Sequence, residues 1–209
     1  MSAVTGLDLM RHAALFVIDL QNDFSHPDGK GAREAGRPID ATRATISVVR
    51  RLLDAARDRQ LPVYFFRQTH DPDHAYPEAW KLIRKRVRFS APQMCVKGTW
   101  GHAIVDELAP LPQEPVYDKL SYSGFCGTSL SADLERDAIQ TIVFTGCSTN
   151  VCVESTLREA FSRGFLPVVP RDAVSSWSRE LHDATLRTLN ERFAVVCDAG
   201  DVLAQWAGD

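Results

Sequence analysis

Short apolar runs, many of them β-branched, alternate along the chain with longer stretches of helical periodicity. Because these runs are apolar on both faces, they are typical of strands in a parallel sheet that helices cover on both sides. The pattern predicts six strands, at residues 13–18, 62–66, 115–117, 141–144, 166–169 and 194–197.

Helical periodicity fills most of the intervals between the apolar runs. In residues 151–163, for example, Val153, Leu157 and Ala160 fall at helical spacing, and Gly164 is a typical C-terminal cap. Strands that alternate with helices imply right-handed crossovers. We therefore predict a doubly wound α/β fold with a mainly parallel six-stranded sheet and helices on both faces. The predicted helices span residues 42–59, 103–108, 131–137, 151–163 and 179–192.

The chain has 209 residues, of which 44% are hydrophobic, enough for one substantial core but short for two. We expect a single domain spanning residues 1–209. The longest irregular stretches are residues 26–38 and 71–101. Stretches of that length in a compact domain are often lids or binding loops.

Charge and cysteine content narrow the classes of partner. The formal net charge is −3, which gives no electrostatic reason to expect nucleic acid or a membrane surface. The N-terminus lacks the pattern of a signal peptide, and its longest apolar run is too short to span a bilayer. Five irregularly spaced cysteines fit reduced thiols better than a disulfide framework or structural zinc. These features predict a cytoplasmic protein that acts on a small molecule.

In a doubly wound sheet, ligands bind beyond the carboxyl ends of the strands, so the polar residues there are the candidates for chemistry. Asp19 follows the first apolar run, Arg67 the second and Lys119 the third. His70 and His74 follow the second run, but the intervening Asp-Pro-Asp disfavours a helix. We therefore interpret these histidines as loop residues and predict no metal site.

Cys152 follows the fourth run, at a predicted strand–turn–helix junction. The free N–H groups of a first helical turn stabilise a thiolate or a developing oxyanion. An isolated cysteine would be interpreted as a packed core thiol. Here a carboxylate and a lysine follow neighbouring strands, and an ammonium close to a thiol favours the thiolate. These surroundings favour Cys152 as a nucleophile.

The three residues together predict a complete hydrolytic cycle. Asp19 takes the thiol proton, Lys119 balances the charges, and Cys152 attacks a carbonyl carbon. Asp19 then returns the proton to the departing amine and activates the water that clears the thioester. The chain has no GxSxG motif for serine chemistry, and no nucleotide-binding GxGxxG or GxxxxGK[ST] motif follows a predicted strand.

Three segments, residues 17–24, 119–125 and 145–156, resemble in order the conserved motifs of the isochorismatase-like cysteine hydrolases. The resemblance implies an Asp–Lys–Cys triad of Asp19, Lys119 and Cys152. It also implies a cis peptide between Cys147 and Ser148, and an oxyanion hole formed by the backbone amides of Ser148 and Cys152. It further implies a homo-oligomer, either a dimer or a tetramer.

Nicotinamidases in this family bind a metal after the second strand, through an Asp and two His residues. The present chain has Gln68 where that Asp is expected, so the resemblance implies neither a metal nor another cofactor. The motifs are most similar to the branch of ureidoacrylate amidohydrolase, biuret hydrolase and N-carbamoyl amidohydrolases. By this resemblance the pocket is expected to include Gln21, Phe24, Arg67, Trp100, Tyr122, Phe125 and Asn150.

Structural interpretations of the same pocket residues stay open: lid packing for Tyr122 and Phe125, a subunit contact for Trp100, and a helix cap for Asn150. The leading functional hypothesis is hydrolysis of a C–N bond in a small ureide, carbamoyl compound or amide. One alternative is vinyl-ether hydrolysis of a small carboxylic acid with Asp19 as general acid. Another is a non-catalytic binding or regulatory protein on this fold.

Overall fold

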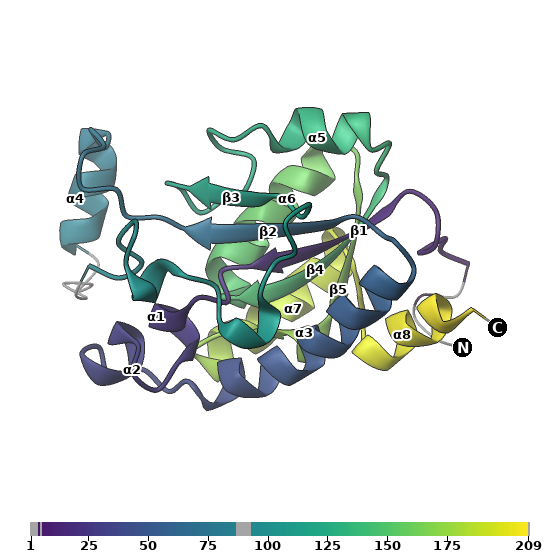
Figure 1. Cartoon of the computed structure of the whole chain (residues 1–209), viewed down its shortest axis with the longest axis horizontal. Coiled ribbons are helices and arrows are strands. Elements are labelled where there is room, and N and C mark those ends of the chain that lie inside the picture. Colours follow the sequence, from purple (N-terminus) through teal and green to yellow (C-terminus); the bar gives the residue numbers. More distant parts are fainter. Residues whose placement is uncertain (1–3, 5, 87–92, 209) are drawn as a thin grey trace.

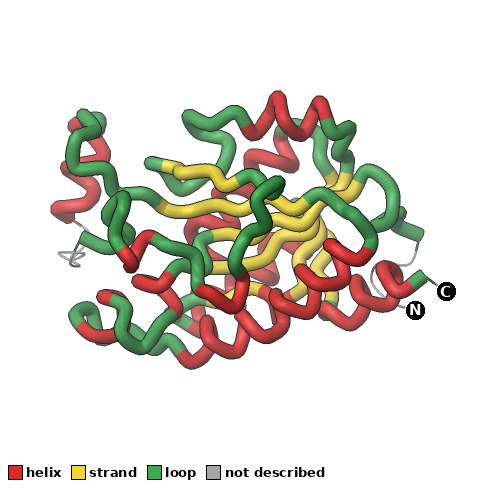
Figure 2. Tube along the Cα trace, in the orientation of Figure 1, coloured by secondary structure: helices red, strands yellow, loops and turns green. Residues whose placement is uncertain are grey.

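A parallel sheet of seven strands runs through the middle of the molecule, as a computed structural model of residues 4, 6–86 and 93–208 shows (Figures 1 and 2). The neighbours in the sheet follow the order β3-β2-β1-β4-β5-β7, and β6 pairs with the end of β4. The strands are β1 (Ala13–Ile18), β2 (Val63–Gln68), β3 (Val116–Lys119), β4 (Thr141–Cys147), β5 (Leu166–Pro170), β6 (Val174–Ser175) and β7 (Val195–Cys197).

The predicted fold class is confirmed, whereas the predicted number of six strands is wrong. The additional strand, β6, contains only Val174 and Ser175, which pair with Gly146 and Cys147 of β4. A strand of two residues leaves no apolar run in the sequence. Its existence depends on a neighbouring strand that lies far away along the chain.

Helices surround the sheet, and α4 projects from one end of the molecule (Figure 1). None of the helices in the described ranges is long and apolar enough to cross a bilayer. The α-helices are α1 (Asn22–Ser25), α2 (Lys30–Arg33), α3 (Asp40–Asp58), α4 (Glu78–Arg86), α5 (Leu130–Arg136), α6 (Glu154–Ser162), α7 (Arg179–Arg192) and α8 (Ala199–Ala207). Short 3-10 turns span Trp100–His102, Asp106–Leu108 and Arg171–Ala173, and a π-helical turn spans Thr149–Val153.

The sheet separates two hydrophobic layers. Because successive side chains of a strand point to opposite faces, Val17 packs in one layer and Phe16 in the other. The Val17 layer contains the apolar residues of α3 and α8, and it buries Trp206 completely. The Phe16 layer contains those of α5, α6 and α7. This is the double covering that the apolar runs predicted.

Several elements differ from the sequence prediction. The predicted helix at 103–108 is only a 3-10 turn at Asp106–Leu108. Helix α4 forms within the stretch 71–101 that was predicted to be irregular, and residues 87–92 of that stretch lie outside the described residues. Helix α8 was not predicted, although Asp198 and Asp201 form a capping box at its start.

The strand order makes β1 the place where the chain reverses its direction across the sheet. From β1 the chain continues to β2 on one side and later enters β4 on the other. In open α/β sheets, such a switch point leaves a crevice at the carboxyl ends of the two central strands. Asp19 directly follows β1, and Cys147 ends β4. The fold therefore places both segments at the same edge of the sheet.

Candidate active site

Strands β1 and β4 approach each other closely at the point where they end. A Cβ atom on Gly146 would lie 2.0 Å from the carbonyl oxygen of Ile18, and φ of Gly146 is +118°. Only glycine combines that backbone conformation with so close a contact. Gly146 therefore lets Asp19 and the turn after β4 lie next to each other, and the thiol of Cys147 donates to the carbonyl oxygen of Asp19 at 3.1 Å.

Asp19 and Lys119 form an ion pair that solvent does not reach. The Lys119 Nζ donates to Oδ2 of Asp19 at 2.7 Å, and both side chains are fully buried. Lys119 ends β3 and Asp19 follows β1, so the lysine extends past the end of β2, which lies between them. The other carboxylate oxygen of Asp19, Oδ1, is buried and has no hydrogen-bond partner among the described residues.

Gln68, the last residue of β2, occupies the space that Lys119 crosses. Its Oε1 accepts a hydrogen bond from Lys119 Nζ at 3.0 Å and lies 3.9 Å from the Sγ atom of Cys152. The parallel register of β2 and β3 pairs Gln68 with Lys119. The lysine, the glutamine and the cysteine therefore meet on one face of the sheet.

The nucleophile candidate, Cys152, lies in the π-helical turn Thr149–Val153 that precedes α6. Its placement in the first turn of a regular α-helix was therefore wrong in detail. The peptide bond between Cys147 and Ser148 is cis, at the position that the resemblance implies. The backbone carbonyl of Ser148 accepts hydrogen bonds from the amides of Val151 and Val153, which closes the turn. The oxyanion hole of the Ser148 and Cys152 amides stays a prediction.

The buried charges determine which partner carries the proton at rest. Burial, and then the negative charge of Asp19, raise the pKa of the Cys152 thiol well above its usual range. Burial also raises the pKa of Asp19, while the charge of Lys119 opposes that shift. For Lys119, burial acts to lower the pKa, but the interactions with Asp19 and Cys152 together outweigh it, so the pKa is raised.

Lys119 does act to lower the pKa of the Cys152 thiol, as expected, but burial and Asp19 act in the opposite direction. The net direction favours the thiol form of Cys152, because burial and the adjacent carboxylate together exceed the effect of the ammonium. Asp19, whose pKa is raised and whose Oδ1 is free among the described groups, is suited to accept the thiol proton during attack.

The isochorismatase domain profile matches residues 13–201. The chain belongs to the isochorismatase family. A ureidoacrylate amidohydrolase from Methylobacterium radiotolerans is 38% identical over 198 residues, which cover 88% of this chain and 75% of that protein. Among solved structures, an isochorismatase-like hydrolase from Alkaliphilus metalliredigens superposes with a TM-score of 0.78 at 28% identity, covering 93% of this chain and 98% of that one. The N-carbamoylsarcosine amidase from Thermoplasma acidophilum superposes with a TM-score of 0.70 at 27% identity, covering 90% and 96%.

Within this isochorismatase domain, Gln21 joins two strand ends to a loop. Its Nε2 donates to the carbonyl oxygens of Gln68 at 3.0 Å and His102 at 2.8 Å, and its Oε1 accepts from the Gln68 amide at 2.8 Å. The side chain is fully buried. These contacts give Gln21 a scaffold role that positions Gln68, and its predicted substrate contact stays a prediction.

Arg67 lies on the face of the sheet opposite to Gln68, because neighbouring residues of a strand point to opposite faces. Its guanidinium binds Asp118 through two hydrogen bonds, of 2.6 and 2.9 Å. Burial opposes ionisation of Asp118, but His102 and Arg67 outweigh it and lower the pKa of that carboxyl to about 2. The structure therefore does not bring Arg67 to the sulfur atom.

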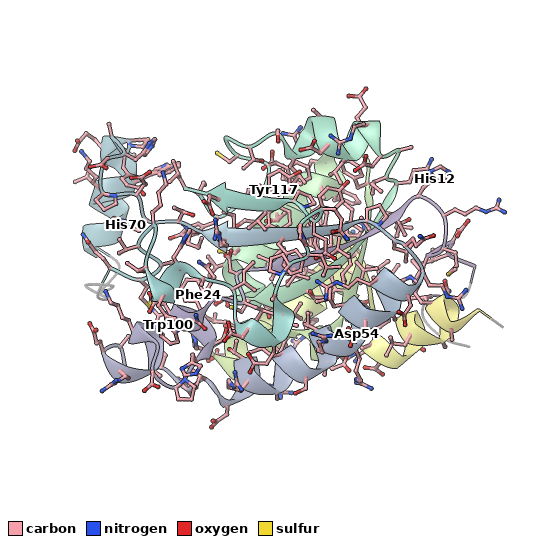
Figure 3. All side chains as sticks on the ribbon, viewed as in Figure 1. His12, Phe24, Asp54, His70, Trp100 and Tyr117 are labelled. Atoms are coloured by element: carbon pink, nitrogen blue, oxygen red, sulfur yellow. The ribbon has the colours of Figure 1, made fainter. Side chains whose placement is uncertain are left out.

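The aromatic pocket candidates separate into two groups. Phe24 and Trp100 lie beyond the ends of β1 and β2 (Figure 3), and Trp100 and Tyr122 are each 52% exposed. Phe125 is buried in the core and stacks on Phe165, which agrees with the packing interpretation that was left open for it.

The side chain of Asn150 accepts a hydrogen bond from Ser176 at 2.6 Å, which connects the turn before Cys152 to the segment after β6.

His70 and His74 both pack against Tyr76. The ring of His70 is nearly parallel to the Tyr76 ring at 5.7 Å, and that of His74 meets it edge-on at 4.8 Å. In the described part of the chain, no group of three or more His, Cys, Asp or Glu side chains has the arrangement of a metal site. Gln68 contributes an amide, a weaker metal ligand than a carboxylate, so this donor set does not fit the nicotinamidase metal.

Sequence reasoning missed two residues near the site. Gln68 was considered only as a replaced metal ligand, although strand alternation beyond residue 66 would have placed it on the face of Lys119. Trp177 was not considered at all. Its ring centroid lies 5.5 Å from that of Phe24, and the Cζ atom of Arg37 lies over the ring, 3.8 Å from its centroid. No periodic pattern in the sequence indicates either contact.

Proposed function

We propose that this protein hydrolyses a C–N bond in a small ureide, carbamoyl compound or amide, with Cys152 as the nucleophile. The single observation that carries the proposal is the free, buried Oδ1 of Asp19 in a cluster with Lys119 and the thiol. An unpartnered buried carboxylate oxygen is costly in a resting protein, and it is useful where a proton must be accepted.

The first chemical step joins sulfur to carbon. As Sγ of Cys152 attacks the carbonyl carbon, its proton moves to Asp19, and the carbonyl oxygen takes the negative charge in the proposed hole of backbone amides. The tetrahedral adduct collapses when the C–N bond breaks and Asp19 gives its proton to the departing nitrogen. The products of this step are a thioester-type acyl enzyme and ammonia or an amine.

The second step clears the enzyme. Asp19, again ionised, takes a proton from water, and the resulting hydroxide adds to the acyl carbon. The C–S bond then breaks, and the thiolate recovers its proton from Asp19. Lys119 stays bound to Asp19 throughout and keeps the net charge of the buried pair close to zero whenever Asp19 is ionised.

The substrate class is proposed from two relatives. The curated relative is named a ureidoacrylate amidohydrolase, and a structural neighbour is an N-carbamoylsarcosine amidase. Both names specify a small compound with a carbamoyl nitrogen. We propose the same class for this chain, and the cluster of Asp19, Lys119 and the Cys152 thiol in this structure supports it.

A screen for ammonia release from ureidoacrylate, N-carbamoylsarcosine and small primary amides tests the proposal. We expect turnover of at least one compound, and a loss of at least about 1,000-fold in kcat for Cys152→Ala and Cys152→Ser. Cys126→Ala is the matched control, because Cys126 is an exposed thiol. Full activity of Cys152→Ala would refute the proposal. Hydrolysis of a vinyl ether that survives loss of the thiol but not Asp19→Asn would favour vinyl-ether chemistry instead.

We also propose a homo-oligomer in the cytoplasm. Three large side chains, Leu82, Trp100 and Tyr122, are exposed on segments at the carboxyl ends of the strands, and exposed apolar groups of this kind often mark contacts between proteins. Light scattering of the purified protein tests the assembly, and a monomer at micromolar concentration would contradict it.

A further inference from the structure

Gln68 has a fixed amide orientation beside the sulfur atom. Its Oε1 faces the Lys119 ammonium at 3.0 Å, and its Nε2 faces the Lys119 carbonyl oxygen at 3.4 Å. A flipped amide would put an N–H group against the ammonium, so the hydrogen-bond network allows one orientation only. The oxygen of the amide is therefore the atom that lies 3.9 Å from the Sγ of Cys152.

Two acceptor atoms thus border the sulfur on the described part of the chain. One is the Oδ1 of Asp19, which has no hydrogen-bond partner among the described residues. The other is the Oε1 of Gln68, which accepts from Lys119 Nζ at 3.0 Å and from the Cys152 thiol at 3.9 Å. Loss of the thiol proton during attack frees the second of its two lone pairs. When the sulfur attacks a carbonyl carbon, the leaving nitrogen is bonded directly to that carbon and therefore also lies close to the sulfur. The leaving nitrogen of a primary carbamoyl group has two N–H donors.

We propose that Gln68 is a substrate-contacting residue whose Oε1 accepts an N–H of the leaving nitrogen and so selects primary carbamoyl groups. The inference rests on the proposed function and narrows it to substrates with a terminal –CO–NH2. An ester or carbamate oxygen in the same place has no hydrogen to donate and gains nothing from this contact. A site built to accept a hydrogen bond discriminates strongly against an analogue that lacks the donor.

The charge of the cluster explains why an amide is suited to this position. The buried groups at rest are the Asp19 carboxylate, the Lys119 ammonium and a neutral thiol, so the pair of charges already cancels. A carboxylate at residue 68 would accept the same N–H but would add a negative charge beside the thiol. That charge would oppose removal of the thiol proton. The glutamine supplies an acceptor without this penalty.

The test compares two substrates that differ only at the leaving group. The first is the primary ureide that the wild-type protein hydrolyses, and the second is its methyl carbamate, in which OCH3 replaces NH2. Gln68→Met keeps the length of the side chain and removes the acceptor. We expect kcat/KM for the ureide to fall roughly 10-fold to 100-fold, and that for the carbamate to change less than about threefold. Gln113→Met, at an exposed glutamine in the loop before β3, is the control.

Equal losses on both substrates would overturn the inference, because Gln68 would then act only by positioning Lys119. An unchanged rate on the ureide would overturn it as well. If the carbamate is only a competitive inhibitor, its Ki replaces kcat/KM in the same comparison. If Gln68→Met does not fold, Gln68→Asn withdraws the oxygen by one methylene and serves instead. A wild-type protein inactive on every ureide and amide would refute the proposed function itself, which distinguishes the two failures.

Discussion

The ammonium of Lys119 lies 2.7 Å from the carboxylate of Asp19, and the two residues belong to strands that are not neighbours. Strand β2 lies between β3 and β1, so the ion pair of Asp19 and Lys119 lies across the carboxyl end of β2, beside Gln68. A buried ion pair gains little net stability when it is intact, since desolvation offsets the attraction between the charges. Loss of one partner, however, leaves an uncompensated buried charge.

We therefore expect Lys119→Met to lower the free energy of unfolding by about 3–5 kcal/mol, measured by urea denaturation at neutral pH. The double variant Asp19→Asn/Lys119→Met removes both charges and should recover much of that loss. If the double variant is destabilised by the sum of the two single effects, the two groups do not interact and this account of the pair is wrong.

The protonation state of Cys152 in the free protein is open to direct measurement. Because its pKa is raised by burial and by Asp19, the thiol should stay protonated at neutral pH. Its alkylation by iodoacetamide should accelerate about tenfold per pH unit between about pH 6 and pH 9, without a plateau near neutrality. Mass spectrometry separates this reaction from that of the exposed Cys126, which serves as an internal reference. A rate independent of pH above about pH 7 would indicate a resting thiolate instead.

The close approach of β4 to β1 predicts a sharp effect at Gly146. A methyl group there would meet the carbonyl oxygen of Ile18 at 2.0 Å, in a backbone conformation that alanine disfavours. We expect Gly146→Ala to lower the free energy of unfolding by more than about 2 kcal/mol. Gly200→Ala is the matched control, since a Cβ at this position of α8 has no atom within 4 Å.

Gly200→Ala should be neutral or stabilising by up to about 1 kcal/mol, because alanine is the better helix former. Thermal or urea unfolding of the two variants gives the comparison. Equal effects at both positions would show that the contact between Gly146 and Ile18 does not determine the spacing of the central strands.

Gln21 allows the scaffold role and the substrate role to be separated. Gln21→Met leaves the part-buried backbone amide of Gln68 and two carbonyl oxygens without this partner, at up to roughly 1–3 kcal/mol for each group that stays unsatisfied. We expect a clear loss in the free energy of unfolding. We also expect that any loss of activity appears alike on every substrate, because the side chain is fully buried. A normal stability with a raised KM for only some substrates would instead support the predicted substrate contact.

The sequence alone was sufficient for the fold class and for the candidate nucleophile, acid and lysine. The bounds of β1 and α7 were predicted without error, because both elements carry an uninterrupted periodic pattern. Strand ends of a parallel sheet must share one edge, so Asp19, Lys119 and Cys152 were expected to meet there. Each of these inferences needs only local periodicity and one general rule about sheets.

What local patterns do not contain is the identity of spatial neighbours. Pairings between distant segments decide that β2 lies between β3 and β1. They also decide that the two residues of β6 form a strand beside β4. The prediction ended β2 at residue 66, so the opposite directions of Arg67 and Gln68 could not be read from it. The balance of burial against charge that raises the pKa of the Cys152 thiol also arises only when three strand ends enclose the same volume. Sequence thus indicated the candidate groups for the chemistry. Tertiary structure shifted their pKa values and placed Gln68 among them, because burial and strand order are properties of the packed sheet.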